Sequence, residues 1–147
     1  MKHLVIAITS LLGLSIASIA GEATWLHDFE AAKKQAQEEH KQILINFTGS
    51  DWCGWCIKLD KEVFSEKEFQ EFAKDRLVLM EVDFPDKKKQ TAEVEAQNIK
   101  LDKDFRVEGY PTVFLIDSEG KKLTDDIGYR KGGAQAYVDH LKTLMKK

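Results

Sequence analysis

Cys53 and Cys56 are the only cysteines in this chain of 147 residues, and two residues separate them. Thiols at this C-x-x-C spacing can exchange disulfides or supply half of a metal site. A purely structural disulfide here would close a very short loop, which removes little entropy from the unfolded chain and so stabilises the fold only weakly. The spacing therefore favours a reactive pair, whose redox-active disulfide needs no separate cofactor.

A metal site is one alternative for the same pair. Its other ligands would have to come from His27, His40 and His140, which are widely spaced, and the chain has no second C-x-x-C. A tetrahedral zinc site would need these distant residues to converge. We therefore predict no metal.

The elements around the pair place it between a strand and a helix. Residues 43–47 have the composition of a buried strand, and residues 48–51 favour a turn. Residues 54–75 are predicted to be helical. At a helix N-terminus the macrodipole and unpaired backbone N–H groups lower the pKa of a thiol, so Cys53 is the expected nucleophile. Cys56, one turn later and better buried, is the expected resolving thiol.

The long helical segment is expected to break near Ser65. Ser65 and Glu68 have the spacing of a capping box, and Phe64 and Phe69 have that of the accompanying hydrophobic staple. A new helix is therefore predicted to begin there.

The other strands predict an α/β fold. Strands are expected at residues 77–83 and 112–116, and a shorter strand ending near Ile127 is expected to form an antiparallel hairpin with the second of them. The order strand, helix, strand implies parallel strands with a right-handed crossover. The fold class is therefore a central mixed β-sheet flanked by α-helices.

Three further segments are expected to be helices, and the apolar side of the last one is expected to cover the sheet. The apolar residues of these helices are Trp25, Phe29, Ala32 and Ala36 in the first; Ala92, Ala96 and Ile99 in the second, which is highly charged; and Tyr137, Val138, Leu141, Leu144 and Met145 in the last.

Two separated motifs carry a resemblance to a known family. Residues 51–56 read Asp-Trp-Cys-Gly-Trp-Cys, and residues 109–112 read Gly-Tyr-Pro-Thr. Together with the element order, they resemble the thioredoxin superfamily over about residues 25–145. The resemblance implies a thioredoxin-like fold, a cis peptide bond before Pro111, and a backbone contact between Tyr110 and the substrate.

Three residues of the first motif are candidates for substrate binding. Gly54 has no side chain to obstruct a polypeptide, while Trp52 and Trp55 offer flat apolar surfaces beside the sulfur. Core packing is the alternative for each tryptophan; it is favoured for Trp25 and in part for Trp52, whereas Trp55 is expected to be exposed.

The sequence departs from thioredoxin at two places. Thioredoxins carry a buried aspartate before the motif, proposed to accept the proton of the resolving cysteine, whereas Asn46 takes that place here, allowing one inserted residue. Glu81 could substitute for it if it faces the interior, but we expect an exposed strand carboxylate. Trp55 stands where thioredoxin has proline and protein disulfide isomerase has histidine.

The expected function is that of an exported thiol-disulfide oxidoreductase. The lack of a cation within the C-x-x-C loop favours a reducing pair and hence a reductase. A disulfide oxidase or isomerase is an alternative, and so is a chaperone-like module that binds polypeptides without redox turnover.

Residues 1–20 have the anatomy of a signal peptide. A positively charged start and an almost uncharged apolar run lead to a small-x-small pattern that predicts cleavage before Gly21. An uncleaved membrane anchor is the alternative, but the run is short and interrupted by polar residues. We expect one periplasmic or secreted domain, residues 21–147, without stable membrane insertion after cleavage.

The charge pattern limits the partners. The formal net charge is −3, and no basic stripe is present that could bind phosphates, so nucleic acid is not an expected partner. We expect protein substrates with disulfides or thiols, and an unidentified redox partner that resets the pair. No dimerisation segment is evident, so a monomer is expected.

Overall fold

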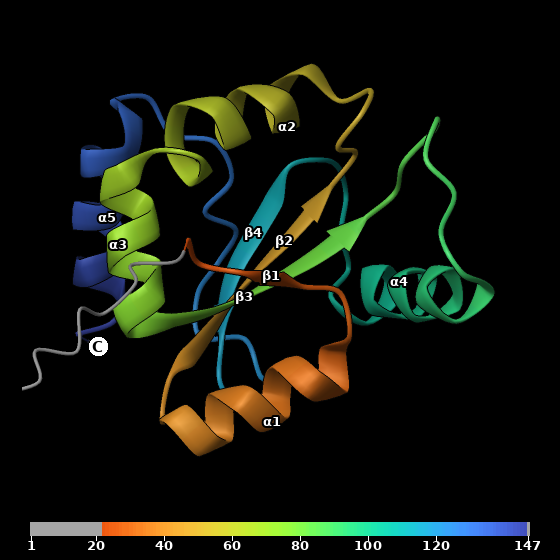
Figure 1. Ribbon diagram of the computed structural model, residues 1–147, viewed down its shortest axis with the longest axis horizontal. Coiled ribbons are helices and arrows are strands. Elements are labelled where there is room, and N and C mark those ends of the chain that lie inside the picture. Colours follow the sequence, from red (N-terminus) through yellow and green to blue (C-terminus); the bar gives the residue numbers. More distant parts are fainter. Residues whose placement is uncertain (1–21, 147) are drawn as a thin grey trace, which may run out of the picture.

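A mixed four-stranded sheet forms the centre of the protein (Figure 1). The computed structural model describes residues 22–146. The strand order is β1-β3-β2-β4, in which β1, β3 and β2 are parallel and β4 is antiparallel to β2. The strands are β1 (Trp25–Leu26), β2 (Gln42–Thr48), β3 (Leu77–Asp83) and β4 (Thr112–Ile116). The predicted mixed sheet is confirmed, while the predicted signal peptide lies outside the described residues.

Helices cover both faces of the sheet (Figure 1). They are α1 (Phe29–Glu39), α2 (Gly54–Leu59), the π-helical turn η1 (Asp60–Phe64), α3 (Lys67–Arg76), α4 (Ala92–Asp104) and α5 (Gly133–Leu144). Helices α1 and α4 pack on one face, and α2, η1, α3 and α5 pack on the other. Two hydrophobic clusters, one on each face, hold these layers together.

The first helix begins later than the sequence pattern suggested. Trp25 lies in β1 and not in the helix, and its ring contacts Phe64 with the centroids 5.1 Å apart. Asp28 is the N-cap of α1, because its carboxylate accepts the N–H of Ala31 at 2.9 Å. This cap begins the helix three residues after Trp25, so Trp25 lies outside it.

The predicted helix break near Ser65 is confirmed, but the predicted capping box is wrong. Glu66 is the N-cap of α3 and makes no capping bond, while the hydroxyl of Ser65 donates to the Asp60 carboxylate at 3.2 Å. The Phe64 and Phe69 rings do contact each other, with centroids 4.9 Å apart. The predicted contact between the two phenylalanines therefore forms, whereas the predicted capping box does not.

The predicted fourth strand does not form. Among the residues described beyond β4, the pairing with that strand consists of an isolated bridge between Ile116 and Lys122 and of backbone bonds from Leu123 to Leu115 and from Ile127 to Val113. The reason is that side chains replace the backbone acceptors of a regular ladder: the N–H of Val113 donates to the Asp126 carboxylate, and the N–H of Leu115 donates to the Thr124 hydroxyl. The segment runs beside β4 as an irregular edge.

The predicted charged helix is α4, and its buried side does not include the three apolar residues that the sequence placed in it. Ala92, Ala96 and Ile99 are exposed, whereas Asn98 and Leu101 are buried. The amide of Asn98 donates to the carbonyl of Asp83 at 2.9 Å, so a polar contact with the end of β3 sets the rotation of this helix.

Candidate active site

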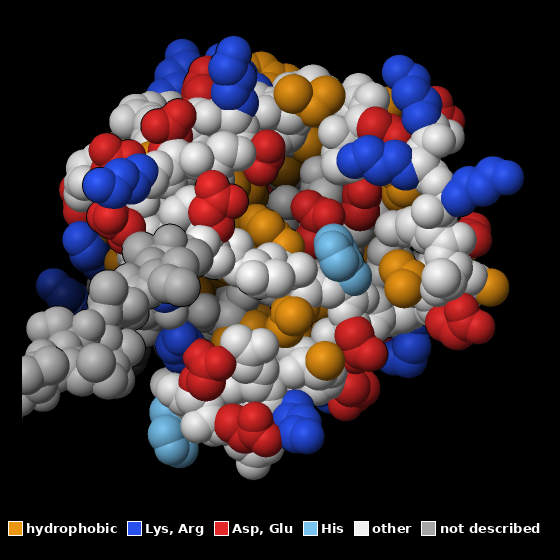
Figure 2. Space-filling view, in the orientation of Figure 1, with side chains coloured by type: hydrophobic (Ala, Val, Ile, Leu, Met, Phe, Trp, Pro, Cys, Tyr) orange, Lys and Arg blue, Asp and Glu red, His pale blue; other side chains and the backbone are white. Residues whose placement is uncertain are grey.

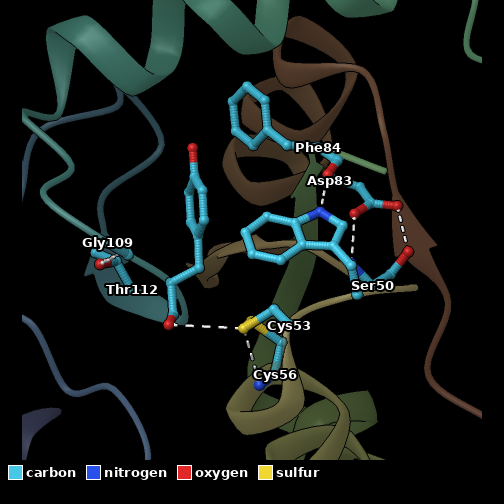
Figure 3. Close-up of a disulfide and its surroundings, with 9 residues drawn as sticks. Ser50, Cys53, Cys56, Asp83, Phe84, Gly109 and Thr112 are labelled. Atoms are coloured by element: carbon cyan, nitrogen blue, oxygen red, sulfur yellow. Dashed lines mark hydrogen bonds between the residues drawn. A yellow bond between two sulfur atoms is a disulfide. The ribbon is translucent and has the colours of Figure 1, made fainter. Parts of the chain in front are cut away.

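A disulfide joins Cys53 and Cys56 where β2 gives way to α2 (Figure 3). Cys53 is the N-cap of α2, and its Sγ accepts the N–H of Cys56 at 3.2 Å. Cys53 is 7% exposed and Cys56 is 4% exposed. The predicted position at a helix start and the deeper burial of Cys56 are both confirmed.

A second loop faces the outer sulfur. The Tyr110–Pro111 peptide bond is cis, as the resemblance implied. The carbonyl oxygen of Tyr110 lies 3.6 Å from the Sγ of Cys53, a contact drawn as a dashed line in Figure 3. The hydroxyl of Thr112 donates to the Gly109 carbonyl at 2.7 Å and braces the turn. The fold therefore brings the two sequence motifs into direct contact.

Both tryptophans of the C-x-x-C motif are exposed, Trp52 by 51% and Trp55 by 56%. The exposure of Trp55 was expected, whereas Trp52 is less buried than the sequence suggested. Trp52 is nevertheless fixed, because its Nε1 donates to the carbonyl of Phe84 at 2.7 Å. Its ring also meets the edge of Tyr110, with the centroids 6.1 Å apart.

Trp55 is supported by a cluster that sequence reasoning missed. Its ring lies against Tyr129, with centroids 5.2 Å apart, and the Lys58 ammonium lies over both rings. The phenol of Tyr129 donates to Glu62 at 2.6 Å, which raises the pKa of Tyr129, and Glu62 also pairs with Lys58 at 3.8 Å. The charge of Lys58 is thus shared between a carboxylate and two ring faces.

Two acidic residues connect the start of the motif with the end of β3 and the segment that follows it, and sequence reasoning missed both roles. The Asp83 carboxylate accepts the N–H and O–H of Ser50, at 2.9 and 2.6 Å (Figure 3). The Asp51 carboxylate accepts the backbone N–H groups of residues 86, 87 and 88, which lower its pKa. The only sequence signal was the turn composition of residues 48–51.

Asn46 and Glu81 are register partners on β2 and β3. Their side chains point to the face covered by α2, because each lies two residues after a core leucine of that face, Leu44 or Leu79. Asn46 is 5% exposed, and within the described chain its Oδ1 has no hydrogen-bond partner. Glu81 is half-buried, so the expectation of an exposed carboxylate is wrong.

Burial raises the pKa of Glu81, and the neighbouring Asp83 carboxylate adds to this effect. His27, whose Nδ1 lies 3.8 Å from the Glu81 carboxylate, acts in the opposite direction.

The model of the thioredoxin-like domain family matches residues 29–141. The chain belongs to this thioredoxin-like family. The match covers most of the segment, residues 25–145, for which the two motifs indicated the resemblance.

Two relatives of this thioredoxin-like protein come from one organism, and one of them is named as a disulfide bond reductase. The disulfide bond reductase DsbH of Chlamydia pneumoniae is 39% identical over 127 residues, which are 86% of this chain and 75% of that protein. The thioredoxin-related protein DsbJ of the same organism is 28% identical over 130 residues, 84% of this chain but 37% of DsbJ. A solved DsbH oxidoreductase structure has a TM-score of 0.81 at 36% identity and covers 95% of both chains.

The predicted family, fold and enzyme class are therefore confirmed. The protein is a thiol-disulfide oxidoreductase whose redox pair is Cys53 and Cys56, and the Dsb relatives imply exchange with protein partners. None of the helices within residues 22–146 combines the length and apolar character that crossing a membrane requires. Over the same residues, no three His, Cys, Asp or Glu side chains form a group that could hold a metal ion.

The raised pKa of Glu81 predicts the pH dependence of stability in this thioredoxin-like domain. A carboxyl group with a raised pKa binds its proton more tightly in the folded state, so its contribution to stability is lost as pH rises above about 4 and through the folded pKa. Glu81→Gln is therefore expected to raise the free energy of unfolding at pH 7 and to leave it unchanged below about pH 4. Urea unfolding at both pH values measures this, and Glu38→Gln, at an exposed site on α1, is the control. Equal stability of Glu81→Gln and wild type at pH 7 would contradict the prediction.

A second prediction concerns the turn before the motif. A Cβ atom at Gly49 would lie 2.6 Å from Cζ2 and 2.7 Å from Nε1 of Trp52, so alanine there must displace the indole. Gly49→Ala is expected to lower the free energy of unfolding by about 1–3 kcal/mol, as overpacking does, and to change Trp52 fluorescence. Gly54→Ala is the matched control, because its Cβ would meet nothing within 4 Å. Its stability should be unchanged or raised by up to about 1 kcal/mol; equal stability of both variants would show that the indole is not held as described.

Proposed function

We propose that this thioredoxin-like oxidoreductase reduces disulfides of proteins outside the cytoplasm, with Cys53 as the attacking thiol and Cys56 as the resolving thiol. The observation that carries the assignment is the hydrogen bond from the Cys56 N–H to the Cys53 sulfur. This bond, at the start of a helix, stabilises a thiolate on Cys53. Cys53 is also the more exposed of the two sulfur-bearing residues.

The reaction begins from the dithiol form. The Cys53 thiolate attacks one sulfur of the substrate disulfide, forms a mixed disulfide and releases the first substrate thiolate, which takes up a proton. Cys56 then loses its proton and attacks the Cys53 sulfur, which releases the second substrate thiolate and closes the Cys53–Cys56 disulfide. Two electrons pass from the protein to the substrate, and a dithiol partner must return them before the next turnover.

The direction of electron flow is proposed from the surroundings of the sulfur. The groups described next to Cys53 are a backbone N–H and a backbone carbonyl, and the charge of Lys58 is shared with Glu62. A cationic partner would stabilise the thiolate and make the pair more oxidising. The name of the DsbH relative, disulfide bond reductase, supports the same direction.

We assign substrate binding to the surface around the sulfur atoms. Trp52 and Trp55, each adjacent in the chain to a cysteine of the pair, provide exposed apolar surface, and a Cβ atom at Gly54 would meet nothing within 4 Å. The backbone of Tyr110, next to Pro111, lies close enough to Cys53 to contact a polypeptide in a mixed disulfide. Export follows from the predicted signal peptide, and the mass of the mature protein tests cleavage before Gly21.

The midpoint potential tests the proposed direction. The protein is equilibrated in buffers of graded dithiol-to-disulfide ratio, and the thiol state is followed by tryptophan fluorescence. A potential near the thioredoxin value of about −270 mV supports a reductase, whereas one near about −120 mV would identify an oxidant. Failure to form the Cys53–Cys56 disulfide at any ratio would exclude redox turnover and leave polypeptide binding as the function.

A further inference from the structure

We propose that Asp102 and the phenol of Tyr110 are positioning residues for the redox pair. Through their hydrogen bond they hold the Tyr110 carbonyl against the Cys53 sulfur and bias Cys53 toward its protonated form. This inference rests on the proposed role of Cys53 as the attacking thiol. It gives α4, which carries Asp102, a part in setting the redox potential.

The connection runs through a single residue. The Tyr110 carbonyl oxygen lies 3.6 Å from the Cys53 sulfur, while the Tyr110 hydroxyl donates to the Asp102 carboxylate at 3.0 Å. The backbone of Tyr110 therefore contacts the reacting atom, and its side chain is anchored on α4. A shift of the ring would move the carbonyl with it.

Aromatic contacts leave the ring little freedom. Tyr110 stacks on Phe84, with the centroids 5.3 Å apart and the planes 24° apart, and meets Trp52 nearly at a right angle. Phe84 is itself held, because its carbonyl accepts the Trp52 indole N–H (Figure 3). The ring contacts fix the plane of Tyr110, and the bond to Asp102 fixes how far along that plane the ring lies.

The bond between the phenol and the carboxylate persists over the working pH range of a protein. Burial, together with the bond to Asp102, raises the pKa of Tyr110 to about 12, so the phenol keeps the proton that it donates. The next acidic residue on α4, Asp104, forms an ion pair with Lys100 instead. Asp102 is half-buried against the loop that carries Tyr110.

Two backbone groups act in opposite directions on the reduced sulfur. A carbonyl oxygen only accepts hydrogen bonds, so it stabilises the S–H form of Cys53 and not the thiolate. The Cys56 N–H only donates, so it stabilises the thiolate. Moving the carbonyl away therefore favours the thiolate, which stabilises the reduced protein and makes the pair more oxidising.

The test compares Tyr110→Phe, which keeps the ring but loses the hydroxyl, with Asp102→Ala and Asp102→Asn. Tyr110→Phe and Asp102→Ala are each expected to change the equilibrium constant with dithiothreitol by about threefold to tenfold. This corresponds to a midpoint less negative by about 15–30 mV. Alkylation of Cys53 in the reduced protein by iodoacetamide, at fixed pH below neutrality, should accelerate in the same variants.

The variants Asp102→Asn and Asp104→Ala distinguish the loss of the hydrogen bond from the loss of a negative charge. Asp102→Asn retains an oxygen that can accept from the phenol, so its potential should stay at the wild-type value. Asp104→Ala removes the same charge from the same helix and should also leave the potential unchanged. The double variant Tyr110→Phe/Asp102→Ala should shift no further than either single variant, since both changes remove one bond.

Three results would overturn the inference: an unchanged potential in Tyr110→Phe, a shift in Asp102→Asn as large as in Asp102→Ala, or an equal shift in Asp104→Ala. The last two would mean that charge acts alone. Mass spectrometry of the alkylated protein distinguishes this failure from failure of the proposed function. If iodoacetamide modifies Cys56 before Cys53, the assignment of the attacking thiol is wrong instead.

Discussion

Replacing Cys53 with serine is expected to abolish disulfide reduction, lowering kcat/KM by at least about a thousandfold, as loss of a nucleophile does. Cys56→Ser should lose steady-state turnover to a similar extent, but for another reason: its Cys53 thiolate still attacks, and the mixed disulfide is not resolved. The two variants should therefore differ in what accumulates. Cys56→Ser should retain covalently bound substrate, and Cys53→Ser should not.

Non-reducing electrophoresis and mass spectrometry measure this difference. Each reduced variant is mixed with an unfolded protein that contains disulfides, and the adducts are counted after alkylation of free thiols. The double variant Cys53→Ser/Cys56→Ser is the control for non-covalent binding. Adducts on Cys53→Ser but not on Cys56→Ser would reverse the proposed order of attack, and adducts on neither would favour a polypeptide-binding module.

The order of attack follows from how one short helix begins. Cys53 caps α2 and receives the Cys56 N–H, so the two cysteines are inequivalent although they lie a single turn apart. Strand β2 leads into the C-x-x-C motif, β4 follows the Tyr110–Pro111 loop, and the two strands are hydrogen-bonded neighbours in the sheet. In this scaffold Cys53 is slightly more exposed than Cys56, at 7% against 4%.

Local signals predicted the parts of the fold that carry the disulfide. The strands β2, β3 and β4 were expected within one residue of their observed bounds, because their β-branched and apolar runs are bordered by turn formers. The cis bond before Pro111 followed from the family resemblance alone. Both cysteines needed only local sequence to be placed correctly.

The rest depends on contacts between residues that are far apart in sequence. Asp126 and Thr124 accept backbone N–H groups of β4 through their side chains. The sequence around these two residues does not predict that such bonds replace a regular strand. Likewise, Tyr129 reaches Trp55, and Phe84 reaches Trp52, only after the chain has folded. Single-sequence patterns report propensity, and such tertiary contacts override it.

Trp52 shows that tertiary contacts also override the sequence-based expectation within the site itself. Apolar residues are expected to be buried, so packing in the core was partly favoured for Trp52. The structure instead leaves about half of its surface open and fixes it through one polar atom, the Nε1 that donates to Phe84. A held, exposed aromatic surface suits recognition of a polypeptide, because little side-chain entropy remains to be lost on binding.

A large loss of stability is expected from a substitution in the hydrophobic core beneath the site. Phe64, the last residue of η1, is 2% exposed and contacts Trp25, Phe69 and Tyr137, which belong to β1, α3 and α5. Phe64→Ala should lower the free energy of unfolding by about 3–5 kcal/mol, because it removes buried apolar surface and leaves a cavity among three elements. For a domain of this size, the melting temperature should fall by about 10–20 °C.

Urea and thermal unfolding of the oxidised protein measure the change, and Ile99→Ala is the control. Ile99 is an exposed apolar residue on α4, so its truncation should change stability by less than about 0.5 kcal/mol. A small effect of Phe64→Ala would mean that α3 and α5 close over the cavity. The midpoint potential of Phe64→Ala should match that of wild type, because a loss shared by the oxidised and reduced folded states cancels in their difference. Stability and potential should therefore respond to different residues, to Phe64 in the core and to the Tyr110–Asp102 pair at the sulfur.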